Sequence, residues 1–162
     1  MLQRLKNVCV WIVLVEFLIG FSWFAKWASK KPDSLLVQAV RRHESGGNEQ
    51  AIGDKKLKQK AYTSLQIRQP ALDDVNKFFA KEIKKIFGRD KLTIEYLKQN
   101  RVALDWCFEK YTGRYATRER LGRSPTDEDR ARIWNGGPNG FKRASTTKYW
   151  KEGVRPYLLA QN

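Results

Sequence analysis

The stretch His43-Glu44-Ser45-Gly46-Gly47-Asn48 decides the fold, because it ends one element and places a carboxyl group at that end. Apolar residues recur at helical spacing between positions 35 and 40, which predicts a helix that begins at an Asp33 or Ser34 cap and runs to about His43. The two glycines stop this helix. Glu44 is therefore expected at the C-terminal end of the helix, where the following turn exposes it beside the core.

Downstream of this stretch the pattern predicts a mainly helical α+β domain. Ile52 and Leu65–Ile67 are candidates for short strands on either side of a basic loop. Further helices are expected at 70–87 with Gly88 as the stop, at 93–111, from a Thr126 cap to Gly136-Gly137-Pro138, and at 146–160 with a kink at Pro156.

Upstream, residues 8–27 form an apolar run that is interrupted by Glu16. A helix of about 20 residues matches the hydrocarbon core of a bilayer, so we expect residues 1–31 to be a membrane anchor and residues 32–162 to be the domain. A cleavable signal peptide is the alternative, although Gly20 with Ser22 is the only suitable pair of small residues before a cut. We expect the N-terminus to lie in the cytoplasm.

The charge of the chain limits the kinds of partner it has. The 162 residues contain 32 Lys and Arg against 17 Asp and Glu, a net charge of +15, and residues 32–162 alone carry +11. Such a domain is attracted to an anionic partner: nucleic acid, a phospholipid surface or a bacterial cell wall. Two cysteines and one histidine are too few for a disulfide framework, a thiolate cluster or a multi-histidine metal site, so we expect no metal or cofactor.

Glu44 is the candidate catalytic group. A carboxyl that is partly desolvated in a cleft has a raised pKa, which is what a general acid working near neutral pH requires. The neighbouring His43 points about 100° away around the helix, so we expect it to be structural or peripheral to the site.

Several strings occur in the order known from one enzyme superfamily. They are Glu44-Ser45-Gly46-Gly47-Asn48, Ala51-Ile52-Gly53-Asp54, Ala61-Tyr62-Thr63-Ser64-Leu65-Gln66-Ile67, Trp134-Asn135-Gly136-Gly137-Pro138-Asn139-Gly140 and Thr147-Lys148-Tyr149. Together they resemble the soluble lytic transglycosylase and goose-type lysozyme superfamily over roughly residues 33–158.

The resemblance implies a lysozyme-like fold that cleaves the glycan strands of peptidoglycan. Glu44 would be the single acid/base, and Ser45 would steady either the helix-end turn or the N-acetyl group of the substrate. Gln66 would match the glutamine of the family's Gly-Leu-Met-Gln motif in the floor of the cleft.

Later motifs complete the implied site. Asn135, with Gly136 beside it, matches the family's Tyr-Asn-Ala/Gly-Gly motif and would bind substrate, and Tyr149 matches the late tyrosine near the catalytic carboxyl. Two departures stand out: Thr63 and Ser64 occupy positions where the family commonly has glycine, and Trp134 replaces the usual tyrosine.

Asp54 leaves the outcome of the reaction open. A glycosidase that uses two carboxylates needs them at a defined separation, and Asp54 is the nearby second carboxylate. If Asp54 faces the cleft it could position a water for hydrolysis; if it is a turn residue, a hydroxyl of the muramic acid attacks and an anhydro sugar forms. We favour the transglycosylase outcome.

The sequence thus predicts a membrane-anchored, peptidoglycan-cleaving enzyme on the periplasmic or cell-wall side of an inner or virion membrane. Envelope remodelling, secretion or conjugation, and phage or virion lysis or entry all suit it, with envelope or virion proteins as further partners. Two alternatives remain: a basic, membrane-tethered nucleic-acid-binding protein, for which no specific motif is found, and a catalytically silent domain that only binds glycan.

Overall fold

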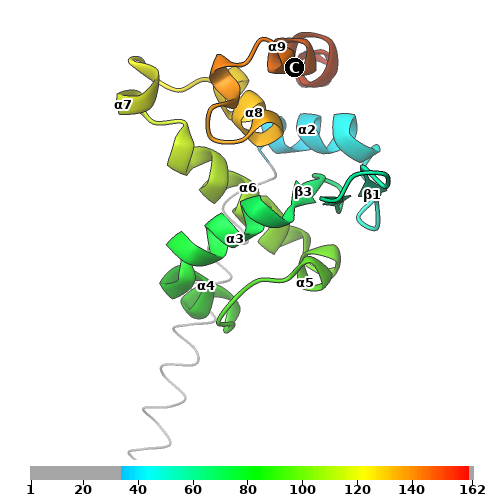
Figure 1. Cartoon of the computed structure of the whole chain (residues 1–162), viewed down its shortest axis with the longest axis vertical. Helices are drawn as coiled ribbons and strands as arrows, with labels where there is room; N and C mark the ends of the chain where they lie inside the picture. The colour runs from blue at the N-terminus through cyan, green and yellow to red at the C-terminus, as the bar shows by residue number, and fades with distance from the viewer. Residues whose placement is uncertain (1–33, 161–162) are drawn as a thin grey trace, which may run out of the picture. The chain divides into compact units, whose positions relative to one another are not determined.

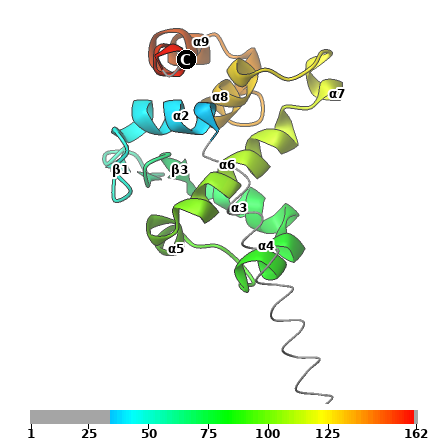
Figure 2. The same cartoon turned by 180° about the vertical axis from the view of Figure 1, so that it is seen from behind.

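A computed structural model describes residues 34–160 (Figures 1 and 2). The predicted anchor at residues 8–27 and the alternative signal peptide lie outside these residues. The described residues belong to one compact unit. Among the described residues, no helix combines the length and the apolar character that crossing a membrane requires.

The described part is mainly helical with one small sheet, as the sequence predicts. Its helices are α2 (Leu35–Ser45), α3 (Gln69–Phe78), α4 (Ala80–Phe87), α5 (Ile94–Gln99), α6 (Arg101–Tyr115), α7 (Arg118–Leu121), α8 (Asp127–Gly136), η1 (Gly140–Lys142), α9 (Ser145–Lys148), η2 (Tyr149–Val154) and α10 (Arg155–Leu159). Its strands are β1 (Ile52–Gly53), β2 (Ala61–Tyr62) and β3 (Ile67–Arg68).

Helix α6 is the central element of the fold. Its buried residues include three consecutive positions, Trp106, Cys107 and Phe108, so it is covered on more than one side. It contacts α3, α5 and α8, and Figures 1 and 2 both show it running through the middle of the domain. A helix that is enclosed in this way supplies the layer on which the other elements pack.

The start and the end of α2 follow from local chemistry. The Ser34 hydroxyl accepts a hydrogen bond from the Val37 amide at 3.3 Å and caps the first turn. Gly46 adopts a left-handed φ of 66° and its amide donates to the carbonyl of Arg42, which stops the helix. Glu44 therefore lies in the last turn, as the sequence predicts.

The three strands form an antiparallel meander in the order β1-β2-β3. Ile52 pairs with Tyr62, and Tyr62 pairs in turn with Ile67. The prediction of strands at Ile52 and Ile67 is confirmed, but Leu65 and Gln66 belong to the turn before β3 and not to the strand.

The predicted helix at 70–87 is wrong as a single element, because the chain bends at Phe79 between α3 and α4. The bend lets Phe79 and Phe87 both pack edge-on against Trp106, with ring centroids 6.0 and 5.4 Å apart. Phe78, at the end of α3, is exposed under the guanidinium of Arg114, 3.3 Å from the ring centroid. Packing on α6 thus overrides the helical period.

The predicted helix at 93–111 is also two elements. The Asn100 side chain accepts a hydrogen bond from the Ala103 amide at 2.9 Å, which caps α6 and separates it from α5. Asn competes for backbone amides in this way, so a helical pattern that contains it can divide there.

The irregularity near the C-terminus precedes Pro156 and is not a simple kink at that residue. Residues Tyr149–Val154 form a wide π-helical turn between α9 and α10, and Pro156 occupies the first turn of α10. Gly153 in this turn lies so close to His43 that a Cβ atom would meet the imidazole at 2.5 Å. The π turn thereby packs Tyr149 and Gly153 against the end of α2.

Candidate active site

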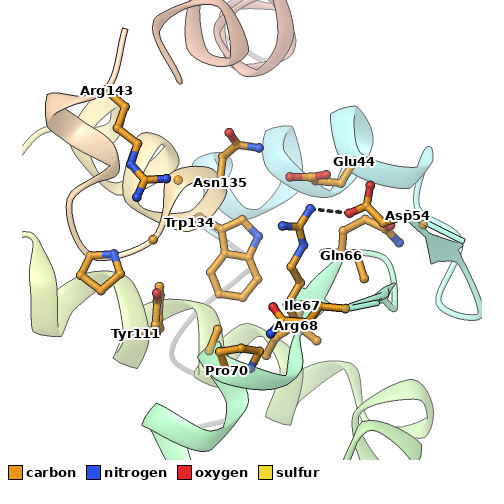
Figure 3. Close-up of a pocket in the computed structure, with 17 residues that line it drawn as sticks. Glu44, Asp54, Gln66, Ile67, Arg68, Pro70, Tyr111, Trp134, Asn135 and Arg143 are labelled. Carbon is orange, nitrogen blue, oxygen red and sulfur yellow. Dashed lines mark hydrogen bonds and ion pairs between the residues drawn. The ribbon is translucent and has the colours of Figure 1, made fainter. Parts of the chain in front are cut away.

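A cavity of about 540 Å³ lies beside the C-terminal end of α2 (Figure 3). One side comes from Glu44, the β1 end and the β2–β3 turn, and the other from α6, α8 and the loop after α8. The lining residues are Glu44, Gly53, Asp54, Gln59, Ala61, Gln66, Ile67, Arg68, Pro70, Ala71, Tyr111, Trp134, Asn135, Gly136, Gly137, Pro138 and Arg143. The site therefore needs residues from both halves of the domain.

Glu44 is the carboxyl whose proton affinity is most suited to chemistry at neutral pH. Burial raises its pKa from the usual range to about 7, and the charge of Asp54 adds to this effect. The hydrogen bond from Tyr149 and the positive charge of Arg68 act in the opposite direction. A carboxyl with this pKa can both donate and accept a proton near pH 7.

Tyr149 lies behind Glu44 and not in the lining of the cavity. Its hydroxyl donates a hydrogen bond of 2.8 Å to Glu44 Oε1. Burial and the neighbouring carboxylate hold the pKa of Tyr149 well above its usual value, so the phenol stays a donor. His43 packs edge-on against Tyr149, with ring centroids 5.0 Å apart, and does not line the cavity, which fits its predicted peripheral role.

Asp54 faces the cavity, where it is joined to Arg68 by an ion pair (Figure 3). It also adopts a left-handed φ of 51° and its carbonyl accepts a hydrogen bond from Leu57 at 2.8 Å. Asp54 therefore combines the two alternatives considered for it, since it is a turn residue whose carboxylate is directed into the cleft. Arg68 neutralises its charge there.

Gln66 and Ser45 have different surroundings. Gln66 lines the cavity with a φ of 54°, and its Nε2 donates to the carbonyl of Thr63 at 2.8 Å. Its Oε1 lies over Gly53, where a Cβ atom would be only 1.9 Å away. Ser45 lies outside the lining: its hydroxyl donates to the carbonyl of Ser64 at 3.0 Å and accepts from the Gly47 amide at 3.2 Å, so it steadies the turn.

The α8 end supplies the facing wall. Asn135 and Gly136 line the cavity as predicted. Trp134 lines it too, donates from Nε1 to the carbonyl of Leu65 at 2.8 Å and packs on Phe108 with ring centroids 4.9 Å apart. The indole thus ties α8 to the turn before β3.

An ionic network around the buried Arg41 holds this turn in place. Arg41, only 4% exposed, pairs with Asp105 and donates to Ser64 Oγ at 3.3 Å. The Ser64 hydroxyl in turn donates to Glu49 Oε2 at 2.6 Å. Ser64 therefore replaces a glycine of the resembled family with a side chain that links α2 to the turn.

Sequence reasoning missed Arg68, Arg143 and Tyr111 as cleft residues. Tyr111 is a buried residue of α6, where burial raises its pKa to about 12, and it also reaches the cavity. The two arginines did not stand out among the 32 basic residues. Gln66 belongs to the turn before β3 and has a left-handed φ, whereas Arg68 belongs to the strand, so strand alternation does not relate the two and no short pattern marked Arg68.

Within residues 34–160, no group of three or more His, Cys, Asp or Glu side chains is placed to hold a metal ion. No protein-family model and no curated protein matches this chain.

Proposed function

We propose that this protein is a peptidoglycan lytic transglycosylase that cleaves the bond between N-acetylmuramic acid and N-acetylglucosamine. The observation that carries the proposal is the Glu44 carboxyl, which has a pKa raised to about 7 and a hydrogen bond to Tyr149 at the edge of a cavity of about 540 Å³. The order of motifs that resembles the superfamily, and the helix-end glutamate beside a small sheet, support a lysozyme-like fold.

In the first step, protonated Glu44 gives its proton to the glycosidic oxygen. The bond from this oxygen to C1 of the muramic acid breaks, N-acetylglucosamine leaves as a neutral alcohol, and positive charge develops at C1. Glu44 becomes a carboxylate, and the hydrogen bond from Tyr149 and the charge of Arg68 stabilise this form.

In the second step, the C6 hydroxyl of the same muramic acid attacks C1. Its proton passes to Glu44, a 1,6-anhydro ring forms and Glu44 is again protonated, so no proton is consumed. One carboxyl suffices for both steps. The pairing of Asp54 with Arg68 favours this route, because a water held by the Asp54 carboxylate would have to compete with the guanidinium for its oxygens.

The experiment compares the full chain with its Glu44→Gln variant on purified peptidoglycan sacculi. Glu95→Gln, on the exposed face of α5, is the matched control. Mass analysis of released fragments should find anhydro-muramic ends from the wild type and the control and none from Glu44→Gln. Reducing ends in their place would make the reaction hydrolysis with Asp54 holding water.

Two outcomes would overturn the proposed activity. Sacculi that bind equally to the wild type and to Glu44→Gln, with no fragments released, would indicate a glycan-binding domain. Absence of release together with salt-sensitive retention of DNA would indicate the nucleic-acid-binding alternative.

We also propose that residues 8–27 anchor the chain in a membrane with the domain on the cell-wall side, since the substrate lies outside the cytoplasm. Protease added to intact spheroplasts should digest the domain. A protected domain would place it in the cytoplasm and contradict this topology.

A further inference from the structure

Arg143 lies at the opposite end of the cleft from Asp54, with Asn135 between them (Figure 3). Nearby arginines have acidic partners: Arg132 pairs with Glu128 at 2.9 Å and Arg130 with Glu109 at 3.0 Å. None of the ion pairs formed within residues 34–160 joins the guanidinium of Arg143 to a carboxylate. This positive charge faces the cavity unpaired.

The backbone of Arg143 is fixed although its charged head is unpaired. Its amide donates to the Gly140 carbonyl at 2.9 Å. Its own carbonyl accepts from Thr146 Oγ1 at 2.8 Å and from Arg132 Nη2 at 3.2 Å. Because the backbone is fixed by these hydrogen bonds, the guanidinium can reach only a limited region. Binding a ligand therefore costs less conformational entropy than it would for an arginine on an unrestrained loop.

The stem of Arg143 lies close to Gly136. A Cβ atom at Gly136 would be 3.6 Å from Arg143 Cδ, which is ordinary contact. Figure 3 shows the side chain extending from this region toward the cavity. Gly136 therefore borders the stem of Arg143 at contact distance, and the contact that excludes a Cβ atom at Gly136 is with Thr146 Cγ2, at 2.6 Å.

The charges in the cleft favour an anionic ligand at this end. Asp54 and Arg68 neutralise each other, and Glu44, with a pKa of about 7, is partly uncharged at neutral pH. Arg143 then leaves the cleft with a surplus positive charge. A guanidinium binds a carboxylate through two parallel hydrogen bonds, whereas sugar hydroxyls give it no comparable charged partner.

We propose that Arg143 binds a carboxylate carried by the glycan strand in the cleft and thereby selects muramic acid chains over neutral glycans. This inference rests on the proposed function and adds a binding site to it. Two groups on the strand have this chemistry: the free lactyl carboxylate of a muramic acid without a peptide, and the carboxylates of an attached peptide stem.

The test measures binding and not cleavage, so that it remains informative if the chain proves inactive. Affinities are measured for full-length Glu44→Gln alone and combined with Arg143→Gln, Arg143→Lys or Lys142→Gln. Lys142 is the matched control, because it is an exposed neighbour with the same charge that does not line the cavity. The ligands are labelled glycan strands stripped of peptide, the same strands with lactyl carboxylates converted to methyl amides, and strands that retain their stems.

We expect Arg143→Gln to weaken binding of carboxylate-bearing strands about tenfold or more, since a hydrogen bond to a charged group contributes roughly 1.5–3 kcal/mol. It should leave binding of the methyl amide strands unchanged, and Arg143→Lys should retain part of the affinity. A loss on stripped strands identifies the lactyl carboxylate; a loss confined to stem-bearing strands identifies the peptide.

Equal weakening on charged and neutral strands, no weakening on any strand, or the same loss in Lys142→Gln would overturn the inference. Failure of the proposed function has a different signature, namely wild-type protein that releases no fragments from sacculi.

Discussion

At the scale of single residues, the site depends on the balance that sets the proton affinity of Glu44. Burial and Asp54 raise its pKa, and Tyr149 and Arg68 lower it, with a result of about 7. The contributions of Asp54, Tyr149 and Arg68 each come from a side chain that can be replaced separately. The balance is therefore open to measurement one residue at a time.

Tyr149→Phe should raise the pKa of Glu44 further above 7, by about one unit. The lost hydrogen bond favours the charged carboxylate, and the net contribution of a hydrogen bond to a charged group is roughly 1.5–3 kcal/mol. An NMR titration of the Glu44 carboxyl measures the shift. Tyr157→Phe, at an exposed tyrosine that also packs near His43, is the control and should leave the titration unchanged. An unmoved pKa in Tyr149→Phe would contradict the assigned hydrogen bond.

Glu44→Gln should be more stable than the wild type above pH 7. The folded state holds the Glu44 proton to about pH 7 and the unfolded state releases it near pH 4.5, so wild-type stability falls as pH rises between these values. The variant lacks this loss and should gain up to roughly 3 kcal/mol, with the gain disappearing below pH 4.5.

Urea unfolding from pH 4 to 8 measures this difference. Glu95→Gln provides the comparison at an exposed glutamate and should show no gain that grows with pH. A constant difference between Glu44→Gln and the wild type across this range would rule out titration as its cause.

At the scale of elements, the close packing of α8 on η1 is set by Gly140. A Cβ atom there would lie 1.9 Å from the carbonyl oxygen of Arg132, so the two elements would have to move apart. Arg143 follows η1 directly, and the loop that carries it depends on this contact.

Gly140→Ala should therefore destabilise the protein by about 1–3 kcal/mol, the usual cost of forcing atoms into a packed region. Gly113→Ala makes the same chemical change within α6, where nothing lies within 4 Å, and should stabilise by up to about 1 kcal/mol through helix propensity. Thermal unfolding of both variants tests the contrast. Unfolding temperatures that move in the same direction in both variants would contradict the difference expected between Gly140 and Gly113.

The sequence predicts those helices whose ends are marked by a capping side chain or a glycine at the end itself. The caps at Ser34 and Thr126 and the stop at Gly88 are side-chain or glycine signals, and all three are confirmed. The break at Phe79 has no such signal, since it depends on the distant Trp106. Asn100 caps α6, but the helical spacing of apolar residues continues across it, so the sequence pattern predicts one helix where the structure has two.

The same distinction applies to the site. Glu44, Gln66, Asn135 and Gly136 belong to recognisable strings and line one cavity. The pairing of Asp54 with Arg68 and the free position of Arg143 depend on side-chain contacts and orientations that no short-range pattern specifies. Thr63 illustrates the limit: it replaces an expected glycine, yet it keeps a left-handed φ of 71°.

At the scale of the whole molecule, the excess of basic residues favours association with an anionic partner. Residues 32–162 carry +11, and the loop between β1 and β2 exposes Lys55, Lys56, Lys58 and Lys60. A field of this sign attracts an anionic polymer before any specific contact forms.

Association of the full chain with sacculi should weaken several-fold between 0.05 and 0.5 M salt, because the screening length falls to a few ångströms at high salt. Co-sedimentation at each salt concentration measures this. Chitin, an uncharged glycan, is the comparison and should show little salt dependence. Binding to sacculi that is insensitive to salt would remove the role assigned to the net charge.

The bond between Tyr149 and Glu44 joins residues 105 positions apart in the chain. During synthesis, Glu44 leaves the ribosome long before its phenol partner and before the α8 wall with Asn135. A nascent chain that ends before these segments has the carboxyl without its enclosing surroundings. The order of translation thus keeps the site unassembled until almost the whole domain has been made.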